Sequence, residues 1–295
     1  KKKASKGKDE CKHLVKKKDG FEADVKGLEG AADELEQKRD AKLNAIGNVL
    51  HDSVPVFQDE KDNEVTALWG RPTAFPGVKY GTNGFRPHFE LLEMLGAVEF
   101  EAGREVAGNR GYFLRGPGVL LNQAMINYGL AFLSARGYTA LQPPFFMKKD
   151  LMAKTAELDD YDDVLYKVVE DKDHPELDKY LIATSEQPIS AFHANQNIPK
   201  PQFPIRYVGT SSCFRREAGS SGRDIRGTFR VHQFEKIEQF VLTDPEKSWE
   251  EHDKMIKMAE EFYQSLNIPY RVIAIVSGGI NNAAAKKYDL EAWFP

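Results

Sequence analysis

The sequence has little cysteine: Cys11 and Cys213 are the only two among 295 residues. They lie far apart in unlike surroundings, which argues against a disulfide framework or a zinc site and favours a reducing compartment. Long apolar runs are also lacking, since no stretch approaches the ~18 consecutive apolar residues that a membrane-spanning helix needs. No apolar segment follows the lysine-rich start, so no secretory signal is indicated. We therefore expect a cytoplasmic protein that is not associated with a membrane.

An overall positive charge is lacking as well. The formal net charge is −4, which by itself counts against nucleic-acid binding, but the distribution of charge matters more than its sum. Residues 1–18 contain nine lysines against Asp9 and Glu10. This block can meet a phosphate backbone, and it can equally be a solvated, partly disordered tail. Both interpretations stay open.

Residues 21–50 are predicted to form a long helix with a narrow apolar seam. The positions of this seam alternate four and three apart; Arg39 and Lys42 occupy two of them, and the others are Phe21, Val25, Leu28, Ala32, Leu35, Ile46 and Val49. This spacing is typical of a two-stranded coiled coil rather than of a globular core. Gly20, Gly27 and Gly30 weaken the prediction, because an interior glycine costs about 1 kcal/mol relative to alanine. The lysine-rich stretch before the helix is too short to supply most of the partner helix.

The chain is predicted to have three parts. Residues 1–52 form a helical arm, residues 53–87 form a linker rich in proline and glycine, and residues 88–295 form a compact domain. In the domain, Pro117 and Gly137 bracket a helix, as helix chemistry prefers. Ser248 and Glu251 have the spacing of a capping box that opens a helix over 249–266. Strands and helices do not alternate regularly, so an α+β fold with an antiparallel sheet flanked by helices is expected.

Two longer strands at 204–217 and 229–242 are predicted to form an antiparallel hairpin. Side chains alternate between the faces of a strand, so Arg215 and Glu217 share one face of the first strand. On the second strand, one face is predicted to carry Arg230, His232, Phe234, Lys236 and Glu238. Such a face is a poor hydrophobic core and a suitable floor for a nucleotide site. The alternative is a surface hairpin whose charges merely pair across the strands.

Each residue type on this hairpin fits one part of a nucleotide-dependent reaction. Arginine holds phosphate through a fork of donors and stabilises negative charge as it develops. Phenylalanine offers an apolar plate for adenine, and a carboxylate accepts hydrogen bonds from a ribose, an amino group or a hydroxyl. The connecting loop, residues 218–228, combines three glycines with Arg223 and Arg226, which suit phosphates or RNA.

Residues 214–240 resemble motif 2 of the class II aminoacyl-tRNA synthetases in its seryl-specific form, with a nearly continuous match. Residues 137–144 resemble motif 1, the dimer-interface segment of that class. The run Thr184-Ser185-Glu186 is similar to the family loop that contacts the serine amino group. Residues 21–56 look like the second arm helix and its exit into the catalytic domain. The resemblance covers most of residues 21–295.

The resemblance implies a class II catalytic domain with an N-terminal tRNA-binding coiled-coil arm, here incomplete. It implies that L-serine and ATP, with Mg²⁺, give seryl-adenylate, and that the seryl group then passes to the 3′ end of tRNA(Ser). It also implies a homodimer formed through the motif 1 segment, and the sequence is more similar to the eukaryotic cytosolic type than to the bacterial one. The reaction would rest on positioning and charge stabilisation rather than on a protein nucleophile.

The resemblance also assigns roles to individual residues. The residues that would act in catalysis are Arg215 and Arg230. Those that would bind ATP are Arg215, Arg216, Glu217, Arg230, Val231, His232, Gln233 and Phe234. Those that would bind serine are Thr184, Glu186, Arg215 and Glu238. Arg223 and Arg226 would contact tRNA, and no metal ligand is assigned among the residues present.

The chain departs from the family pattern at both ends. It ends at Trp293-Phe294-Pro295, before the segment with the metal-binding carboxylate and before motif 3. We therefore expect these 295 residues alone not to catalyse aminoacylation. Two alternatives stay open: a ligase of the same fold that charges a carrier protein, and a non-catalytic synthetase-like paralogue.

Overall fold

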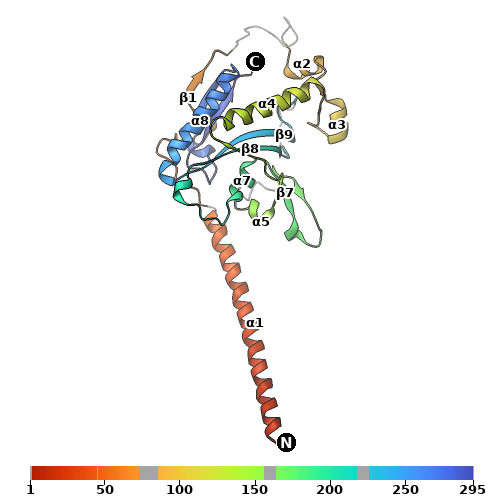
Figure 1. The fold of residues 1–295 in the computed structure, drawn as a ribbon, viewed down its shortest axis with the longest axis vertical. Helices are drawn as coiled ribbons and strands as arrows, with labels where there is room; N and C mark the ends of the chain where they lie inside the picture. The colour runs from red at the N-terminus through yellow and green to blue at the C-terminus, as the bar shows by residue number, and fades with distance from the viewer. Residues whose placement is uncertain (1, 45, 73–85, 156–163, 218–225, 295) are drawn as a thin grey trace. The chain divides into compact units, whose positions relative to one another are not determined.

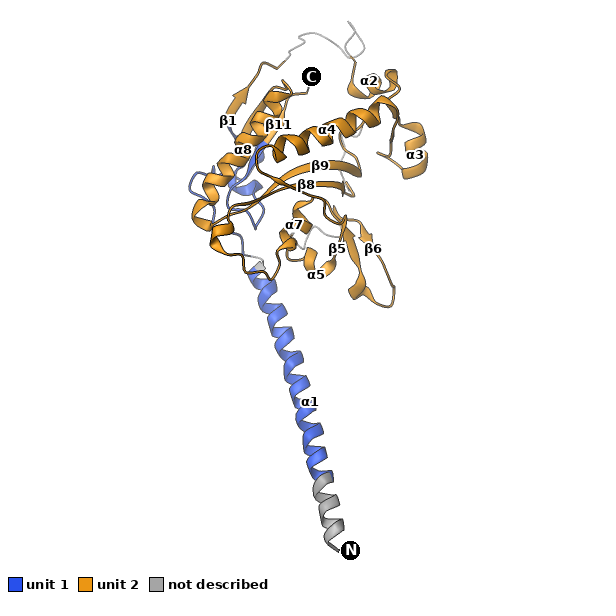
Figure 2. Ribbon diagram, viewed as in Figure 1, with its two compact units in different colours: residues 1–65, 273–289 blue, residues 66–272, 290–295 orange. Residues whose placement is uncertain are grey.

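The structure, a computed structural model, describes residues 2–44, 46–72, 86–155, 164–217 and 226–294. Its contacts divide the chain into two units (Figure 2). The first comprises residues 1–65 and 273–289, and the second comprises residues 66–272 and 290–295. The boundaries predicted from the sequence, after residues 52 and 87, stay predictions.

Helix α1 (Lys2–Asn44) is the main element of the first unit (Figure 1). It begins well before the predicted residue 21, so the interpretation of the lysine-rich stretch as a disordered tail is wrong; lysine is a good helix former. It also ends before the predicted residue 50. The backbone N–H of Asn48 donates to Asn282 O at 2.7 Å, and that of His51 donates to Ala285 O at 2.9 Å. These bonds replace helical ones and end the helix early.

The seam predicted on α1 is exposed in the structure. Every side chain described from residue 12 to residue 43 is exposed, including Phe21 at 65% and Leu28 at 71%. A helix with such a seam gains most of its stability from a partner. The predicted coiled-coil partner therefore stays a prediction.

Part of the segment predicted as a linker is ordered secondary structure. Strand β1 (Glu64–Trp69) lies in a three-stranded sheet of order β1–β10–β11, with β10 at Tyr270–Ala274 and β11 at Tyr288–Ala292. The short helix η1 (Glu60–Asp62) precedes β1, and the Asp59 carboxylate caps it by accepting from Lys61 N at 3.0 Å. The predicted linker therefore contains secondary structure at residues 60–62 and 64–69, and its boundaries stay predictions.

The second unit centres on the predicted hairpin, which is confirmed. Strands β8 (Ile205–Phe214) and β9 (Gln233–Leu242) pair antiparallel in an unbroken register from Ile205↔Leu242 to Phe214↔Gln233. Strand β4 (Thr139–Leu141) pairs with β8 on its other edge, and this pairing is parallel. The expected α+β class is confirmed, with one parallel pair that arises because a long crossover separates β4 from β8.

Two helices cover one face of this sheet (Figure 1). Helix α4 (Pro117–Ser134) starts at proline, and Gly137 follows its end with a positive φ of 87°, as predicted. Helix α8 (Ser248–Ser265) lies beside it. The core between helices and sheet holds Phe132, Leu133, Tyr138 and Val208, with Ile237, Val241, Met258 and Phe262 packed against it.

A second small sheet packs near the other face of the hairpin. Its order is β5–β7–β6, with strands Phe146–Lys148, Lys179–Leu181 and Lys167–Val168. It shares a core with helix α5 (Lys149–Met152) that includes the fully buried Met152 and Ile182. Helix α7 (Glu186–Phe192) follows β7 and approaches the hairpin on the face away from α4.

Shorter elements complete the second unit. These are α2 (His88–Met94), β2 (Val98–Glu99), α3 (Glu101–Ala107), β3 (Phe113–Leu114), η3 (Pro175–Leu177), η4 (Lys200–Gln202) and η6 (Pro245–Lys247). Within the described residues, no helix is both long and apolar enough to span a bilayer.

The predicted capping box at the start of α8 is wrong. Ser248 Oγ donates to Pro245 O at 3.0 Å, so it does not cap the helix. The Glu251 carboxylate is 6% exposed and accepts from Arg206 at 2.6 Å and from Lys254 at 2.9 Å. A buried carboxylate needs charged partners, and those partners take it away from the helix N-terminus.

Candidate functional site

Glu238 lies at the centre of a group of hydrogen-bond donors. On β9 it is paired with Gly209 of β8, whose lack of a side chain leaves space for the segment that enters α7. Three donors of that segment reach the carboxylate oxygen Oε2: Thr184 Oγ1 at 2.6 Å, Ser185 Oγ at 2.7 Å and Glu186 N at 3.0 Å. We call Glu238, these donors and Lys236 the carboxylate cradle.

Lys236 completes the cradle from the same face of β9. Its Nζ donates to Glu238 Oε1 at 2.6 Å and to Thr184 Oγ1 at 3.0 Å. Burial alone raises the pKa of Glu238, but the Lys236 charge and the hydrogen bonds from Lys236, Thr184 and Ser185 outweigh it, so the pKa is held below its usual value. The carboxylate is therefore ionised and fixed in one orientation at neutral pH.

The neighbouring carboxyl, Glu186, behaves in the opposite way. Burial raises its pKa above the usual value, and the nearby Glu238 charge raises it further, while Lys236 opposes both. No hydrogen bond to its side chain is recorded within the described residues, although its backbone N–H serves Glu238. Although the residue as a whole is exposed, the Glu186 carboxyl lies beside the Glu238 charge, and its own charge is left to be balanced by a cationic group.

Arg215 and Phe234 form a second pair on the cradle's face of the hairpin. Arg215 N donates to His232 O at 2.9 Å, which extends the ladder one residue beyond the end of β8. The Arg215 guanidinium carbon lies 5.3 Å from the centre of the Phe234 ring. Cys213, which pairs with Phe234 across the strands, is fully buried, and burial raises the pKa of its thiol. A cation beside an aromatic plate is suited to a purine carrying phosphate.

A third group joins Arg230, Glu217 and Arg110. Arg230 Nε donates to Glu217 Oε2 at 2.7 Å, and Arg110 Nη1 lies 3.5 Å from the same oxygen. The side chains of Arg110 and Glu217 are 7% and 10% exposed, whereas that of Arg230 is 50% exposed. Glu217 thereby fixes one end of Arg230 and leaves the rest of its guanidinium facing solvent.

The structure does not place all predicted residues on one strand face. Strand β9 begins at Gln233, so Arg230 and His232 lie on the approach to the strand, and the prediction that they share its face is wrong. A strand needs partner residues, and the ladder stops at the Arg215–His232 bond. Of the remaining predicted ATP residues, Val231 is buried, and the backbone N–H of Arg216 donates to Val164 O at 2.9 Å.

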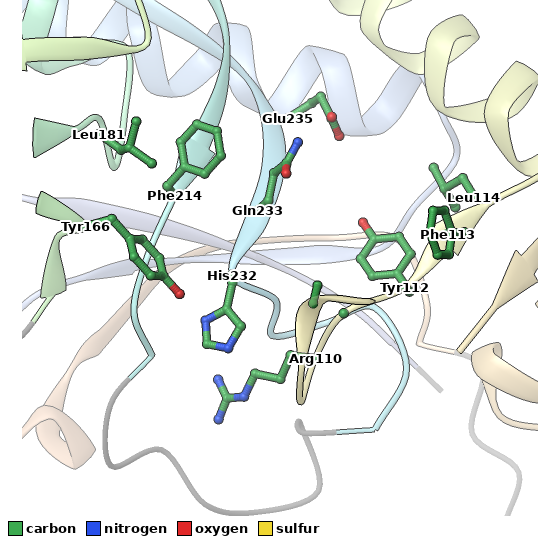
Figure 3. A pocket seen from close by; sticks show the side chains of 12 residues that line it. Arg110, Tyr112, Phe113, Leu114, Tyr166, Leu181, Phe214, His232, Gln233 and Glu235 are labelled. Atoms are coloured by element: carbon green, nitrogen blue, oxygen red, sulfur yellow. The ribbon is translucent and has the colours of Figure 1, made fainter. Parts of the chain in front are cut away.

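A cavity of about 480 Å³ lies beside the end of the hairpin (Figure 3). Arg110 and Tyr112 enter it from the segment before β3, and His232 enters it from the approach to β9. Its other lining residues are Ala107, Gly111, Phe113, Leu114, Tyr166, Leu181, Phe214, Gln233 and Glu235. Of the predicted site residues it takes in His232 and Gln233, and it leaves out the others, among them Phe234 and Glu238.

The predicted tRNA contacts are only partly covered. Arg223 lies outside the described residues, whereas Arg226 is exposed and lines a second cavity. Within the part of the chain that the structure describes, no group of three or more His, Cys, Asp or Glu side chains is arranged to hold a metal ion.

Sequence reasoning missed four contributors to these groups: Lys236 as a partner, Ser185, Gly209 and Arg110. Lys236 has a readable signal, since it stands between Phe234 and Glu238 in the alternation of β9. Gly209 and Arg110 have no such signal in the sequence. The role of Gly209 depends on the pairing register of the strands, and that of Arg110 depends on a contact with Glu217, more than a hundred residues away.

Residues 166–295 match the family model of the tRNA synthetase class II core domain (G, H, P, S and T). The chain is 52% identical over 297 residues to a Candida albicans protein named cytoplasmic serine–tRNA ligase, covering 98% of this chain and 63% of that protein. It is 51% identical to the Saccharomyces cerevisiae protein of the same name, with the same coverage. The chain thus spans less than two thirds of the length of these relatives.

Two solved structures are similar to the chain over most of its length. One is a cytoplasmic serine–tRNA ligase from Naegleria fowleri in complex with AMP, with TM-score 0.81 and 48% identity, covering 92% of this chain and 62% of that one. The other is a seryl-tRNA synthetase from Pyrococcus horikoshii complexed with ATP, with TM-score 0.81 and 41% identity, covering 90% and 61%.

Proposed function

Since the chain belongs to the seryl-tRNA synthetase family, we propose that it acts as a serine–tRNA ligase. The ligase activates L-serine with ATP and transfers the seryl group to the 3′ end of tRNA(Ser). The observation that carries this proposal is the carboxylate cradle, in which an ionised Glu238 is fixed beside Glu186, on the hairpin face that also carries Arg215 and Phe234.

Serine recognition follows from which oxygens of the cradle are still available. Oε2 of Glu238 already accepts three hydrogen bonds, so Oε1 has the remaining lone-pair capacity. We assign the serine hydroxyl to Oε1, where it would donate beside the Lys236 ammonium. The serine ammonium would balance the charge of Glu186 and lie next to Thr184. Alanine would leave Oε1 without this donor, which is the physical basis of selectivity.

ATP would lie along the face marked by Phe234. The adenine would stack on the Phe234 ring, the Arg215 guanidinium would hold the α-phosphate and the serine carboxylate, and Arg230 would meet the terminal phosphates. The fixed Glu217–Arg230 bond supports this assignment, because an arginine oriented before binding loses less entropy on meeting phosphate. Arg216, Val231, His232 and Gln233 would contribute by holding the hairpin end, through backbone positions close to the nucleotide.

The proposed reaction has two steps that need no protein nucleophile. In the first, a carboxylate oxygen of serine attacks the α-phosphorus, the bond to the β-phosphate breaks, and pyrophosphate leaves with the electron pair. In the second, a ribose hydroxyl of the terminal tRNA nucleotide attacks the seryl carbonyl and AMP leaves. The protein positions the reactants, and Arg215 and Arg230 stabilise the charge that develops on phosphate oxygens.

Mg²⁺ would neutralise phosphate charge, and the described residues fit it poorly. The carboxylate nearest to Arg230 is Glu217, and two guanidinium groups already engage it. Mg²⁺ commonly binds through substrate phosphates and water with only one or two carboxylates. We therefore propose that it enters with ATP, and we assign it no ligand among these residues.

The remaining partners are proposed on narrower grounds. Arg226 is proposed to contact tRNA together with Arg223. A homodimer through the motif 1 segment is proposed from the resemblance, and helix α4, which precedes that segment, exposes apolar side chains such as Leu120 at 72% and Leu121 at 60%. A cytoplasmic location is proposed because the similar fungal proteins carry that word in their names.

The proposal is tested by serine-dependent exchange of pyrophosphate into ATP, followed by charging of tRNA(Ser), with the complete protein. We expect exchange with serine and not with alanine or threonine, and charging of tRNA(Ser) but not of a carrier protein. Exchange without charging of any tRNA would favour the carrier-protein ligase. Absence of both, with ATP binding intact, would sink the enzyme proposal in favour of a non-catalytic paralogue.

A further inference from the structure

The segment that leads into β9 contacts the first residue of helix α2. His88 begins α2, and its ring nitrogen Nε2 accepts a hydrogen bond from the backbone N–H of Thr228 at 3.1 Å. The two residues are 140 positions apart in the sequence and lie in the same unit. Thr228 stands two residues before Arg230, which the proposed function assigns to the terminal phosphates of ATP. A side chain of α2 thus holds the backbone next to a proposed phosphate ligand.

Gly227 shows how closely the imidazole approaches this segment. Its φ is 79°, and a Cβ built on it would lie 2.0 Å from His88 Nε2 and 2.6 Å from His88 Cε1. Only glycine allows both this backbone conformation and this approach of the ring. The hydrogen bond to Thr228 and the glycine beside it are therefore two separate features that fit the segment to His88.

Aromatic rings pack around the imidazole. The ring centres of His88 and Phe229 lie 4.4 Å apart, and that of Phe294 lies 5.8 Å from His88 and 4.5 Å from Phe229. All three pairs meet edge to face, an arrangement that the charge distribution of aromatic rings favours. Phe89 makes a further edge contact at 5.5 Å. Ring contacts as well as the hydrogen bond thereby join the segment to α2.

The segment 227–230 is fixed at two points. His88 holds its start through Thr228, and Glu217 holds its end, because Arg230 Nε donates to the Glu217 carboxylate at 2.7 Å. Since the side chain of Arg230 is 50% exposed, packing alone does not fix its orientation. A backbone shift at Thr228 would therefore move the Arg230 guanidinium.

The hydrogen bond requires a neutral imidazole. A backbone N–H only donates, so Nε2 must keep its lone pair, and the proton of the neutral ring is then on Nδ1. Burial lowers the pKa of His88 from the ordinary value of 6.5. The acceptor is therefore present at neutral pH and is lost as the pH falls through the lowered pKa.

The surroundings of the ring contain no partner that would hold a proton on it. The groups packed against it are Gly227, Thr228 and the three phenylalanines, none of which titrates. The charged residues nearest along these elements are Arg86, Glu90, Arg226, Arg230 and Glu291. Arg86 pairs with Glu90 at 3.1 Å, and no charged group of the described residues contributes to the lowered pKa of His88.

We propose that His88 is a positioning residue for ATP, which fixes Thr228 and thereby orients Arg230 toward the terminal phosphates. The inference rests on the proposed function, in which Arg230 meets those phosphates. In this assignment His88 does not touch the substrate and acts through the backbone of the segment. A protonated His88 lacks the acceptor, so the affinity for ATP is expected to fall at a pH below about 6.5.

Two substitutions separate the aromatic ring from the acceptor. His88→Phe keeps a ring without an acceptor, whereas His88→Gln offers an amide oxygen without a ring. The control is His174→Gln, at an exposed histidine of the same unit whose Nδ1 lies 2.9 Å from Glu176. With the complete protein, serine-dependent pyrophosphate exchange gives kcat and the KM values for ATP and serine over a range of pH. Urea unfolding of the same samples measures stability.

His88→Phe is expected to raise the KM for ATP about fivefold at a pH above 7, as the loss of one hydrogen bond implies, and to leave the KM for serine unchanged. His88→Gln should recover part of the affinity for ATP. In the unsubstituted protein the KM for ATP should rise as the pH falls below about 6.5, more steeply than in either variant. His174→Gln should behave as the unsubstituted protein does.

Nitrogen-15 NMR of the imidazole rings gives a readout that does not depend on activity. The signals that disappear in His88→Gln identify the ring of His88. At neutral pH its Nε2 should have the chemical shift of an unprotonated nitrogen and its Nδ1 that of a protonated one. Acidification should protonate Nε2 over the same pH range in which the KM for ATP rises.

Three results would overturn the inference. One is an unchanged KM for ATP in His88→Phe, whether or not its stability falls. Another is an equal rise in the KM values for ATP and serine, which would indicate a general disturbance of the site. The third is a protonated Nε2 at neutral pH.

His88→Gln keeps the inference open to refutation if His88→Phe does not fold. The same pH dependence of the KM for ATP in His88→Gln and in the unsubstituted protein would contradict a role of the imidazole. A protein without serine-dependent exchange would refute the proposed function instead. Calorimetric titration of the same variants with ATP would then still decide whether His88 supports nucleotide binding.

Discussion

The β8–β9 hairpin and helix α1 use their charged residues in opposite ways. In the hairpin, Glu238 is enclosed by donors from the α7 segment and by Lys236. In α1, Lys18 and Glu22 pair at 3.0 Å with side chains that are 68% and 63% exposed. An exposed helical pair contributes about 0.3–0.5 kcal/mol, whereas leaving a buried charge without its partner costs about 3–5 kcal/mol.

The difference shows which region has its binding groups held in place by the fold. All the donors of the cradle come from the chain itself, so the cradle can select a small molecule by geometry. The described side chains of α1 are all exposed, so this helix offers a long surface with charge and an apolar seam. The same substitution is therefore expected to have opposite consequences in the two regions.

The largest effect is expected for Glu238→Ala. Loss of the carboxylate removes the acceptor for the serine hydroxyl and leaves Thr184, Ser185 and Lys236 without their partner. We expect the serine KM to rise and the preference for serine over alanine, about 10⁴-fold for sites of this kind, to be largely lost. Pyrophosphate exchange with the two amino acids measures this ratio.

The matched control is Glu235→Ala on the same strand. Glu235 projects from the other face of the strand than Glu238, meets Asn122 at 3.5 Å, and lines the first cavity rather than the cradle. An unchanged amino-acid preference in Glu238→Ala, or an equal loss in the control, would contradict the assignment of the cradle.

The next effect is expected for Gly209→Ala. A Cβ at this position would lie 2.3 Å from Ser185 Oγ and 2.8 Å from Ile189 Cδ1. Overpacking of this kind costs about 1–3 kcal/mol, and here it also displaces a donor of the cradle. Urea unfolding should show the loss of stability, and the serine KM should rise.

Adding Ser185→Ala to Gly209→Ala provides the internal check. It removes the closest clashing atom, so the double variant should be more stable than the sum of the two single changes predicts. If the losses of stability in the two single variants simply add in the double variant, the contact with Ser185 is not the cause of the loss in Gly209→Ala.

A smaller effect of opposite sign is expected for Gly27→Ala in α1. A Cβ there meets no atom within 4 Å, and alanine is about 1 kcal/mol better than glycine inside a helix. The helical signal at 222 nm should therefore persist to a higher temperature. Gly27→Pro is the counterpart and should break the helix, whereas a loss of helicity in Gly27→Ala would contradict the exposed helix described for α1.

The smallest effect is a difference in titration between the two neighbouring carboxyls, Glu186 and Glu238. Burial, then the Glu238 charge, raises the pKa of Glu186, whereas Lys236 and the cradle hydrogen bonds hold the pKa of Glu238 low against burial. Acidification should thus protonate Glu186 first. The raised pKa of Glu186 stabilises the folded protein at low pH, and this contribution to the free energy of unfolding is lost as the pH rises through that pKa. The lowered pKa of Glu238 stabilises the folded protein at neutral pH, and this contribution is lost as the pH falls through that pKa.

Carbon-13 NMR of the glutamate carboxyls measures both titrations directly. As the pH is lowered, serine affinity should begin to fall at a pH above the ordinary glutamate pKa of about 4.3, because Glu186 is protonated there and loses its charge. Protonation of Glu238 before Glu186 would refute this order. In Glu186→Gln, the fall in serine affinity should shift to lower pH.

Much of the hairpin could be predicted from the sequence, because period-two alternation and flanking breakers are local signals. The same holds for α4, whose proline start and Gly137 end are read correctly. The ends of the strands could not be predicted in this way. In the sequence, Arg230 and His232 continue the period-two alternation of side chains, but the hydrogen-bonded ladder ends at the Arg215–His232 bond, before these residues can join the strand.

The errors elsewhere have the same origin in long-range contacts. The end of α1 is set by carbonyls of Asn282 and Ala285, and Glu251 is taken from its helix by Arg206. The proximity of Arg110 to Glu217 is invisible to local patterns for the same reason. Residue types could be identified from spacing, whereas their partners required the folded chain.

The unbroken pairing from Ile205↔Leu242 to Phe214↔Gln233 limits how this protein can change in length. One residue gained or lost inside either strand would turn every following side chain to the opposite face, so the cradle would lose Glu238 while the helix-covered core received charge. Relatives that keep this site should therefore differ in length in the connection between the strands and keep both strands free of insertions and deletions.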